Sequence, residues 1–248
     1  MIKKILLAFT FVSLICLNAN AQMPLIGDNA PAFCAQTTQG KVNFPKAYAG
    51  KWVILFSHPA DFTPVCTTEF IAFQRMICDF QALNTELIGL SIDNLDDHIK
   101  WLKSIEEFSY QGIQNPKITF PLIADPKMEV AKKYGMLQSK ASTTKTVRAV
   151  FFIDPNAKIR AILYYPLTTG RNMEELKRLL IAMQTFDAFG AKTPANWCPG
   201  DDVIVKSEQE KKAEATMPSM EKTCYTPYLC TIKLSKEALM QKLMGNSK

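Results

Sequence analysis

One short segment constrains this chain more than any other: Thr63-Pro64-Val65-Cys66-Thr67-Thr68-Glu69, placed directly after the apolar run Trp52 to Phe56. A polar turn after an apolar run, followed by Pro and an apolar-periodic stretch, predicts strand, loop and helix, with Thr63 as N-cap and Pro64 as first helical residue. The thiol of Cys66 then lies in the first helical turn, where free amides and the helix dipole favour a thiolate. A capped helix with an ordinary buried cysteine is the alternative.

A reactive thiolate at this position needs more support than the helix supplies. An unperturbed thiol has a pKa of about 8.5, and lowering it by roughly two pH units takes ~2.7 kcal/mol, whereas a helix terminus provides ~0.3–1 kcal/mol. A cation must therefore reach Cys66 from elsewhere. Arg148 begins the apolar run to Ile153, which predicts a buried strand, and Arg171 precedes a helical segment, where a cation is locally unfavourable. For each arginine, a solvated edge is the alternative.

The segment from Phe56 to Glu69 resembles the active-site segment of the AhpC/TSA peroxiredoxins, in particular the 1-Cys, peroxiredoxin 6-like subfamily. Three further blocks carry the same resemblance at family-typical spacing. They are Arg148-Ala149-Val150-Phe151-Phe152-Ile153-Asp154, then Tyr164-Tyr165-Pro166-Leu167-Thr168-Thr169-Gly170-Arg171-Asn172, then Thr193-Pro194-Ala195-Asn196-Trp197 with Gly200-Asp201-Asp202-Val203-Ile204-Val205. The similarity runs from about Pro24 to about Val205.

The resemblance implies a thiol-specific peroxidase that reduces hydrogen peroxide and organic hydroperoxides through a cysteine sulfenic acid, in antioxidant defence. It makes Cys66 the peroxidatic cysteine, with Thr63 hydrogen-bonded to thiolate and peroxide, and with Arg148 and Arg171 as cationic support. Attack on one peroxide oxygen turns the other into a developing alkoxide or hydroxide, which preplaced donors stabilise. No metal or organic cofactor is then required, and a thiol reductant must restore the sulfenic acid.

Three polar residues near this motif have weaker signals. Glu69 lies one turn beyond Cys66 and could orient an arginine, but a carboxylate early in a helix is also what the dipole favours. His58 resembles the family's active-site histidine, although a lone histidine is often structural. His98 follows Asp96 and Asp97 and is predicted to be a surface helix residue.

The remaining cysteines fall into three groups. Cys34 and Cys78 lie in apolar sequence and are predicted to be inert packing residues, and Cys198 has no assigned role. Cys224 and Cys230 resemble the paired C-terminal cysteines that resolve the sulfenic acid in some members of the subfamily. A local disulfide or two spare thiols is the alternative.

The first residues have the pattern of an export signal. The basic region is Lys3-Lys4, the apolar region runs from Ile5 to Leu17, and the small-residue cleavage region is Ala19-Asn20-Ala21. The apolar region is too short to span a bilayer comfortably. Residues 1–21 are thus predicted to be removed after Ala21, leaving a periplasmic or secreted protein with no membrane anchor. Loss of two lysines lowers the formal charge from +6 to +4 (6 − 2), which argues against nucleic-acid binding.

The order of strands and helices in the mature chain predicts an α/β fold around a mixed central sheet in residues 22–187. The resemblance implies that this fold is thioredoxin-like and that residues 188–248 are a C-terminal dimerisation extension. Strands are expected at 52–57, 86–92, 119–124, 147–154 and 159–165, with a short one at 203–205. Helices are expected at 66–83, 96–108, 128–134, 172–186 and 207–217. The resemblance implies a homodimer as the minimal unit, with a ring of dimers as a higher assembly.

Other function classes have less support. A thioredoxin-type dithiol oxidoreductase would show Cys-x-x-Cys at the helix start, but Thr67-Thr68-Glu69 follows Cys66. A binding module with a decayed site is the second alternative, although the residues of the motif are all present. Zinc binding has little support, because no close Cys or His pairs show ligand spacing.

Overall fold

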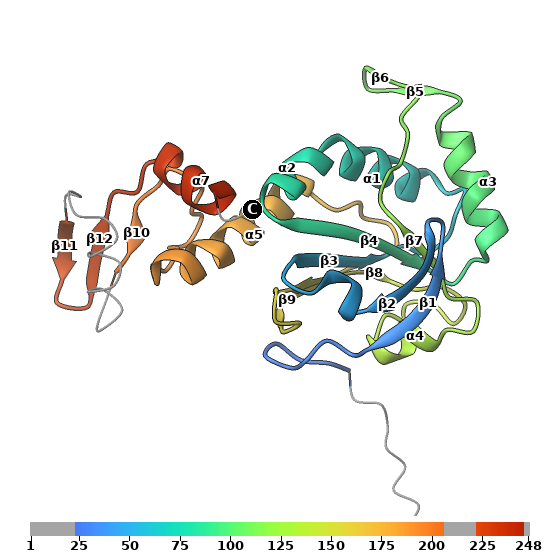
Figure 1. Cartoon of the computed structure of the whole chain (residues 1–248), viewed down its shortest axis with the longest axis horizontal. Coiled ribbons are helices and arrows are strands. Elements are labelled where there is room, and N and C mark those ends of the chain that lie inside the picture. The colour runs from blue at the N-terminus through green and yellow to red at the C-terminus, as the bar shows by residue number, and fades with distance from the viewer. Residues whose placement is uncertain (1–22, 206–221, 246–248) are drawn as a thin grey trace, which may run out of the picture.

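The structure is a computed structural model that describes residues 23–205 and 222–245 (Figure 1). The predicted export signal in residues 1–21 lies outside the described residues. So does the helix predicted at 207–217. No helix in the two described stretches is long and apolar enough to cross a membrane.

A seven-stranded mixed sheet forms the main body, in the order β2-β1-β7-β4-β3-β8-β9. Its strands are β1 (Phe33–Thr37), β2 (Gly40–Phe44), β3 (Trp52–Ser57), β4 (Thr85–Ser91), β7 (Leu122–Ala124), β8 (Arg148–Ile153) and β9 (Ile159–Tyr165). Strand β4 runs parallel to both β3 and β7, whereas β8 pairs antiparallel with β3 and β9. The predicted α/β, thioredoxin-like class with a mixed sheet is confirmed.

Strand β3 is buried on both faces, which explains its uninterrupted apolar sequence. Ile54 and Phe56 belong to a core cluster shared with helices α1 (Pro64–Arg75) and α5 (Met173–Phe189), and Val53 and Leu55 belong to a second cluster shared with β1, β2 and α4 (Glu129–Lys133). Figure 1 shows α1 and α2 (Ile77–Ala82) on one side of the sheet and α4 on the other. The sheet is therefore the middle layer of the body, and its buried strands fix the position of the loops at their ends.

The helices are α1 (Pro64–Arg75), α2 (Ile77–Ala82), α3 (Leu95–Ile105), α4 (Glu129–Lys133) and α5 (Met173–Phe189). The single helix expected at 66–83 is wrong, because Met76, with φ −102° and ψ 8°, ends α1 and begins α2. After this break Phe80 is fully buried, whereas Ile77 is only partly buried. A short 3-10 helix (Lys46–Tyr48) and the hairpin β5 (Ser109–Tyr110) and β6 (Ile113–Gln114) complete the body.

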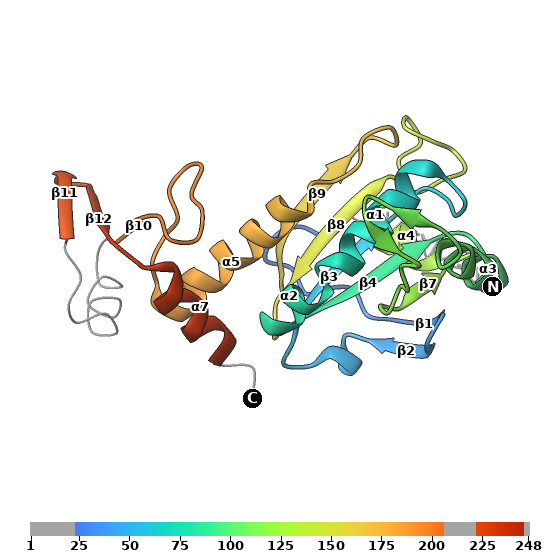
Figure 2. The ribbon, with the colours of Figure 1, turned by 90° about the horizontal axis from the view of Figure 1, so that it is seen from above.

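A second, smaller unit follows α5 and contains β10 (Val203–Ile204), β11 (Lys222–Thr226), β12 (Leu229–Ile232) and helix α7 (Lys236–Gly245). Its sheet has the order β10-β12-β11. Figures 1 and 2 show it at the far end of α5 from the seven-stranded sheet. Its apolar residues, such as Ile232 and Leu239, join the core cluster along α5. Helix α5 continues past position 187/188, where the sequence predicts the domain boundary. That boundary stays a prediction.

Candidate active site

Cys66 lies in the first turn of α1, at the end of the loop that follows β3. Thr63 has the extended N-cap conformation (φ −113°, ψ 144°) and Pro64 is the first helical residue, but the Thr63 side chain makes no capping hydrogen bond. Its hydroxyl donates instead to the carbonyl of Ala60 at 2.8 Å. The Cys66 side chain is buried.

Arg148, the first residue of β8, is the cation that contacts the thiol. Its Nη1 lies 3.2 Å from Cys66 Sγ and donates to Glu69 Oε2 at 2.7 Å. Its Nε and Nη2 both donate to the carbonyl of Leu167, at 3.1 and 2.7 Å. With both sides of the guanidinium fixed in a buried setting, the charge is held against the sulfur, where it stabilises a thiolate.

Arg171, in the loop between β9 and α5, reaches the same site through Glu69 rather than through the thiol. Its backbone N and Nε donate to Glu69 Oε1, each at 2.8 Å, and its Nη2 donates to Oε2 at 2.7 Å. The guanidinium also lies over the ring of Phe56, 5.1 Å from the centroid. The structure thus brings both predicted arginines together, but among the described contacts only Arg148 touches Cys66.

Glu69 joins the two arginines and is almost completely buried. Burial by itself raises the pKa of Glu69, but the charge and hydrogen bonds of Arg171, together with Arg148, outweigh it and lower the pKa below its ordinary value. The group is therefore a carboxylate that fixes two guanidinium groups. This geometry supports the orienting role that the sequence left open.

His98 is a correction to the sequence analysis, because it is fully buried rather than on the surface. It lies on the inward face of α3 together with Trp101 and Ile105. Its Nδ1 lies 2.6 Å from Asp61 Oδ2 and its Nε2 lies 3.1 Å from the carbonyl oxygen of Ile123. Both ring nitrogens thus have a hydrogen-bond partner, and the ring links helix α3 to the loop before Cys66 and to β7.

His58 binds the other oxygen of the same carboxylate, with Nε2 2.9 Å from Asp61 Oδ1. Burial lowers the pKa of His58 despite the nearby Asp61, so the ring is neutral at neutral pH. The two histidines lower the pKa of Asp61 although burial opposes this. Asp61, which the sequence analysis did not single out, thereby ties the loop before Cys66 to helix α3.

A metal ion has one candidate position among the residues described. His58, Asp61 and Asp93 place potential ligand atoms within 4.8 Å of one another. Asp61 already binds two histidines, and Asp93 Oδ2 accepts from Ser91 Oγ at 2.7 Å and from the Asp61 amide at 3.0 Å. His58 Nδ1 is buried without a hydrogen-bond partner among the described residues, but the two carboxylates are already paired within the protein, and we assign the three residues no metal.

The other cysteines lie away from this site. Cys34 and Cys78 are both exposed, so the prediction that they are packing residues is wrong: Cys34 is on an outward-facing position of β1 and Cys78 on the outer face of α2. Cys198 is also an exposed free thiol. Cys224 and Cys230 face each other across β11 and β12 and form a disulfide.

The fold and this site together define a class, a thioredoxin-like oxidoreductase with one thiol at a helix start supported by a buried arginine. Residues 26–162 match the model of the AhpC/TSA family, and residues 182–217 match the C-terminal domain of 1-Cys peroxiredoxin. The peroxiredoxin of Methanosarcina mazei is 59% identical over 215 residues, which cover 85% of this chain and 98% of that protein.

Solved structures agree with these matches. A yeast mitochondrial 1-Cys peroxiredoxin superposes with a TM-score of 0.75 at 41% identity, covering 86% of this chain and 100% of its own. Peroxiredoxin 6 of Arenicola marina has a TM-score of 0.75 at 35% identity, covering 86% of this chain and 99% of its own. The chain belongs to the AhpC/TSA peroxiredoxin family, in its 1-Cys, peroxiredoxin 6-like branch. It is a thiol-dependent peroxidase, and so an antioxidant oxidoreductase.

Proposed function

We propose that Cys66 is the peroxidatic residue of this enzyme and that it reduces hydrogen peroxide and organic hydroperoxides through a sulfenic acid. The observation that carries the proposal is the position of Arg148 Nη1, 3.2 Å from Cys66 Sγ and 2.7 Å from Glu69 Oε2. A buried cation fixed beside a thiol at a helix start favours the thiolate, which is the nucleophile toward peroxide.

The reaction transfers two electrons from the sulfur to the peroxide. The Cys66 thiolate forms an S–O bond with one peroxide oxygen while the O–O bond breaks, and the other oxygen leaves as alkoxide or hydroxide and takes up a proton. Arg148 stabilises the negative charge as it moves from sulfur to oxygen. The Thr63 hydroxyl, whose proton is directed to Ala60, offers its oxygen as acceptor for the peroxide O–H.

Peroxide consumption by the purified protein tests this assignment. Dithiothreitol serves as the first reductant, followed by thioredoxin and glutathione systems, because the yeast relative resolves its thiol through glutathione/thioredoxin systems. We expect Cys66→Ser to abolish turnover, since a serine hydroxyl is not ionised at neutral pH. The control is Cys78→Ser, which removes an exposed free thiol. Retained activity in Cys66→Ser would remove Cys66 from the mechanism.

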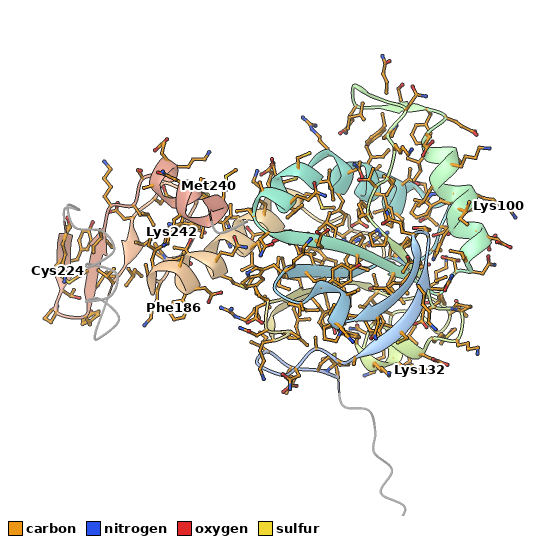
Figure 3. All side chains as sticks on the ribbon, viewed as in Figure 1. Lys100, Lys132, Phe186, Cys224, Met240 and Lys242 are labelled. Carbon is orange, nitrogen blue, oxygen red and sulfur yellow. A yellow bond between two sulfur atoms is a disulfide. The ribbon has the colours of Figure 1, made fainter. Side chains whose placement is uncertain are left out.

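We further propose that Cys224 and Cys230 resolve the sulfenic acid between subunits of a homodimer. Cys230 of the partner subunit attacks the sulfenic sulfur, which forms a mixed disulfide and releases water. Cys224 then displaces the Cys66 thiolate and closes the Cys224–Cys230 disulfide. This disulfide forms within the hairpin, and Figures 1, 2 and 3 show β11 and Cys224 far from α1 of the same chain. That separation favours transfer between subunits over transfer within one.

A non-reducing gel after one equivalent of peroxide distinguishes this relay from direct reduction of Cys66 by an external thiol. The relay requires a dimer-sized band that accumulates in Cys224→Ser and is absent in Cys230→Ser. An oxidised species unchanged in both variants contradicts the relay and leaves the tail disulfide structural.

We also propose that the enzyme is a homodimer that can assemble into a ring of dimers, and that it works outside the cytoplasm. The match of residues 182–217 to the C-terminal domain of 1-Cys peroxiredoxin supports an oligomeric state. The basic, apolar and small-residue regions of residues 1–21 support export. Light scattering of the eluted protein measures the assembly, and a monomer mass would contradict it.

A further inference from the structure

The ladder between β3 and β8 stops one residue before the catalytic loop. Backbone pairing runs from Val53 opposite Ile153 to Phe56 opposite Val150. Ser57 and Ala149 come next, and their backbone groups face each other, because the neighbouring amide, that of His58, points the other way to Leu90. A regular rung at this position would direct the Ala149 amide to the Ser57 carbonyl.

The Ser57 hydroxyl takes that place instead. The Ala149 amide donates to Ser57 Oγ at 3.1 Å and also to the carbonyl of Val147 at 3.1 Å, and the Ser57 hydroxyl donates to that same carbonyl at 2.6 Å. One residue further on, the Thr146 hydroxyl donates to the carbonyl of His58 at 2.6 Å. Beyond Val150 the two strands are thus also joined through side-chain hydroxyls.

Arg171 binds at this end of the β3–β8 pair. Its Nη1 donates to the carbonyl of Ser57 at 3.0 Å and to the carbonyl of Ala149 at 3.2 Å. The remaining donors of the guanidinium go to Glu69, which in turn holds Arg148 against Cys66. Hydrogen bonds therefore connect Ser57 to the thiol through Arg171, Glu69 and Arg148.

We propose that Ser57 is a positioning residue of the peroxidase: its hydroxyl replaces a backbone rung and so leaves two carbonyl oxygens to hold the guanidinium of Arg171. Both Ser57 and Ala149 are fully buried, so when the hydroxyl is removed the acceptors left to the Ala149 amide lie within the protein: the Val147 carbonyl of its own strand and the Ser57 carbonyl across the pair. A hydrogen bond from this amide to the Ser57 carbonyl would take that oxygen from Arg171. The expected effect of Ser57 on turnover rests on the proposed role of Cys66, whereas the expected effect on the reactivity of the Cys66 thiol does not.

Ser57→Thr and Ser57→Val give the sharpest test, because they match in shape and differ in the hydroxyl. We measure the pH dependence of Cys66 alkylation by mass spectrometry, without peroxide, and then the rate of peroxide reduction. In Ser57→Val we expect the alkylation midpoint to move to higher pH and kcat/KM for peroxide to fall about tenfold, the size of one lost hydrogen bond to a charged group. Ser57→Thr stays near wild type.

Thr85→Val is the matched control for loss of a buried hydroxyl. Thr85 is buried on β4, and its hydroxyl donates to the carbonyl of Leu83 at 2.9 Å, at the opposite end of the sheet from Cys66. We expect this variant to lose stability but to keep the wild-type alkylation profile. If Ser57→Val does not fold, Ser57→Ala, which adds no volume, replaces it in the comparison with Ser57→Thr.

Equal alkylation profiles in the variants with and without the hydroxyl overturn the proposal. Failure of the proposed function has a different signature, turnover that survives Cys66→Ser, and the alkylation measurement does not depend on it. The kcat/KM for the reductant separates the two further, because it stays unchanged when only the peroxide step is slowed.

Discussion

Replacing Glu69 with Gln tests whether one buried carboxylate organises the site. The native side chain accepts hydrogen bonds from Arg148 Nη1 at 2.7 Å, from Arg171 N and Nε at 2.8 Å and from Arg171 Nη2 at 2.7 Å. Gln keeps the shape but directs an NH2 group at guanidinium donors. It also leaves two cations in the interior without their counter-charge.

The size of the effect follows from burial. Glu69 and Arg171 have side chains 2% and 0% exposed, and removing one partner of a buried ion pair costs ~3–5 kcal/mol. Glu175→Gln is the control, because Glu175 pairs with Arg178 at the surface and is 39% exposed. In urea denaturation at pH 7 we expect the free energy of unfolding to fall by about 3–5 kcal/mol for Glu69→Gln and by less than ~1 kcal/mol for the control.

The pH dependence has a definite sign. Because the arginines hold the pKa of Glu69 below its ordinary value, the carboxylate stabilises the fold above the unfolded pKa of about 4.3. This contribution is lost as the pH falls through the lower folded pKa. The gap between wild type and Glu69→Gln is therefore constant near neutrality and narrows in acid. A loss no larger than that of the control, or a gap that persists in acid, would refute the reasoning.

Three further predictions follow from the site and the chain start. Arg148→Lys removes the forked contact with Cys66 and the Leu167 carbonyl, so we expect slower peroxide reduction and an alkylation midpoint at higher pH, and an unchanged alkylation profile would count against the contact. His98→Gln leaves Asp61 with one histidine partner, and we expect a loss of ~2–4 kcal/mol in unfolding free energy, which a change below ~1 kcal/mol would contradict. Mature protein from its native host should begin at Gln22 by N-terminal sequencing, and a start at Met1 would remove the export proposal.

The parts of the fold that the sequence predicts well are those set by local pattern. Strands β3 and β9 begin and end where expected, because each is an apolar run bounded by turn residues. The break at Met76 had no such signal, since neither Gly nor Pro stands there. The hairpins β1–β2 and β11–β12 also went unpredicted, because short half-exposed strands carry weak alternation.

His98 shows why a surface position predicted from neighbouring polar residues alone was wrong. The acidic residues before it indicate a solvated face, but Trp101 and Ile105 follow at spacings that share its helical face, and this apolar stripe was the available signal. Its partner Asp61 lies 37 residues away in sequence. A pair of buried polar groups that satisfy each other across the fold leaves no trace in the local pattern of either.

Residues that are unfavourable in their own strand or helix indicated the site better than the local pattern did. Arg148 is a cation within an apolar strand, and Arg171 precedes a helix whose N-terminus is already capped by Asn172, whose side chain accepts from the Glu175 amide at 3.2 Å. Neither arginine is favoured by its own element. Both are held by Glu69, which belongs to the helix that carries Cys66. Residues that break a local rule in separate segments, with opposite charge available in a third, thus indicate where those segments meet.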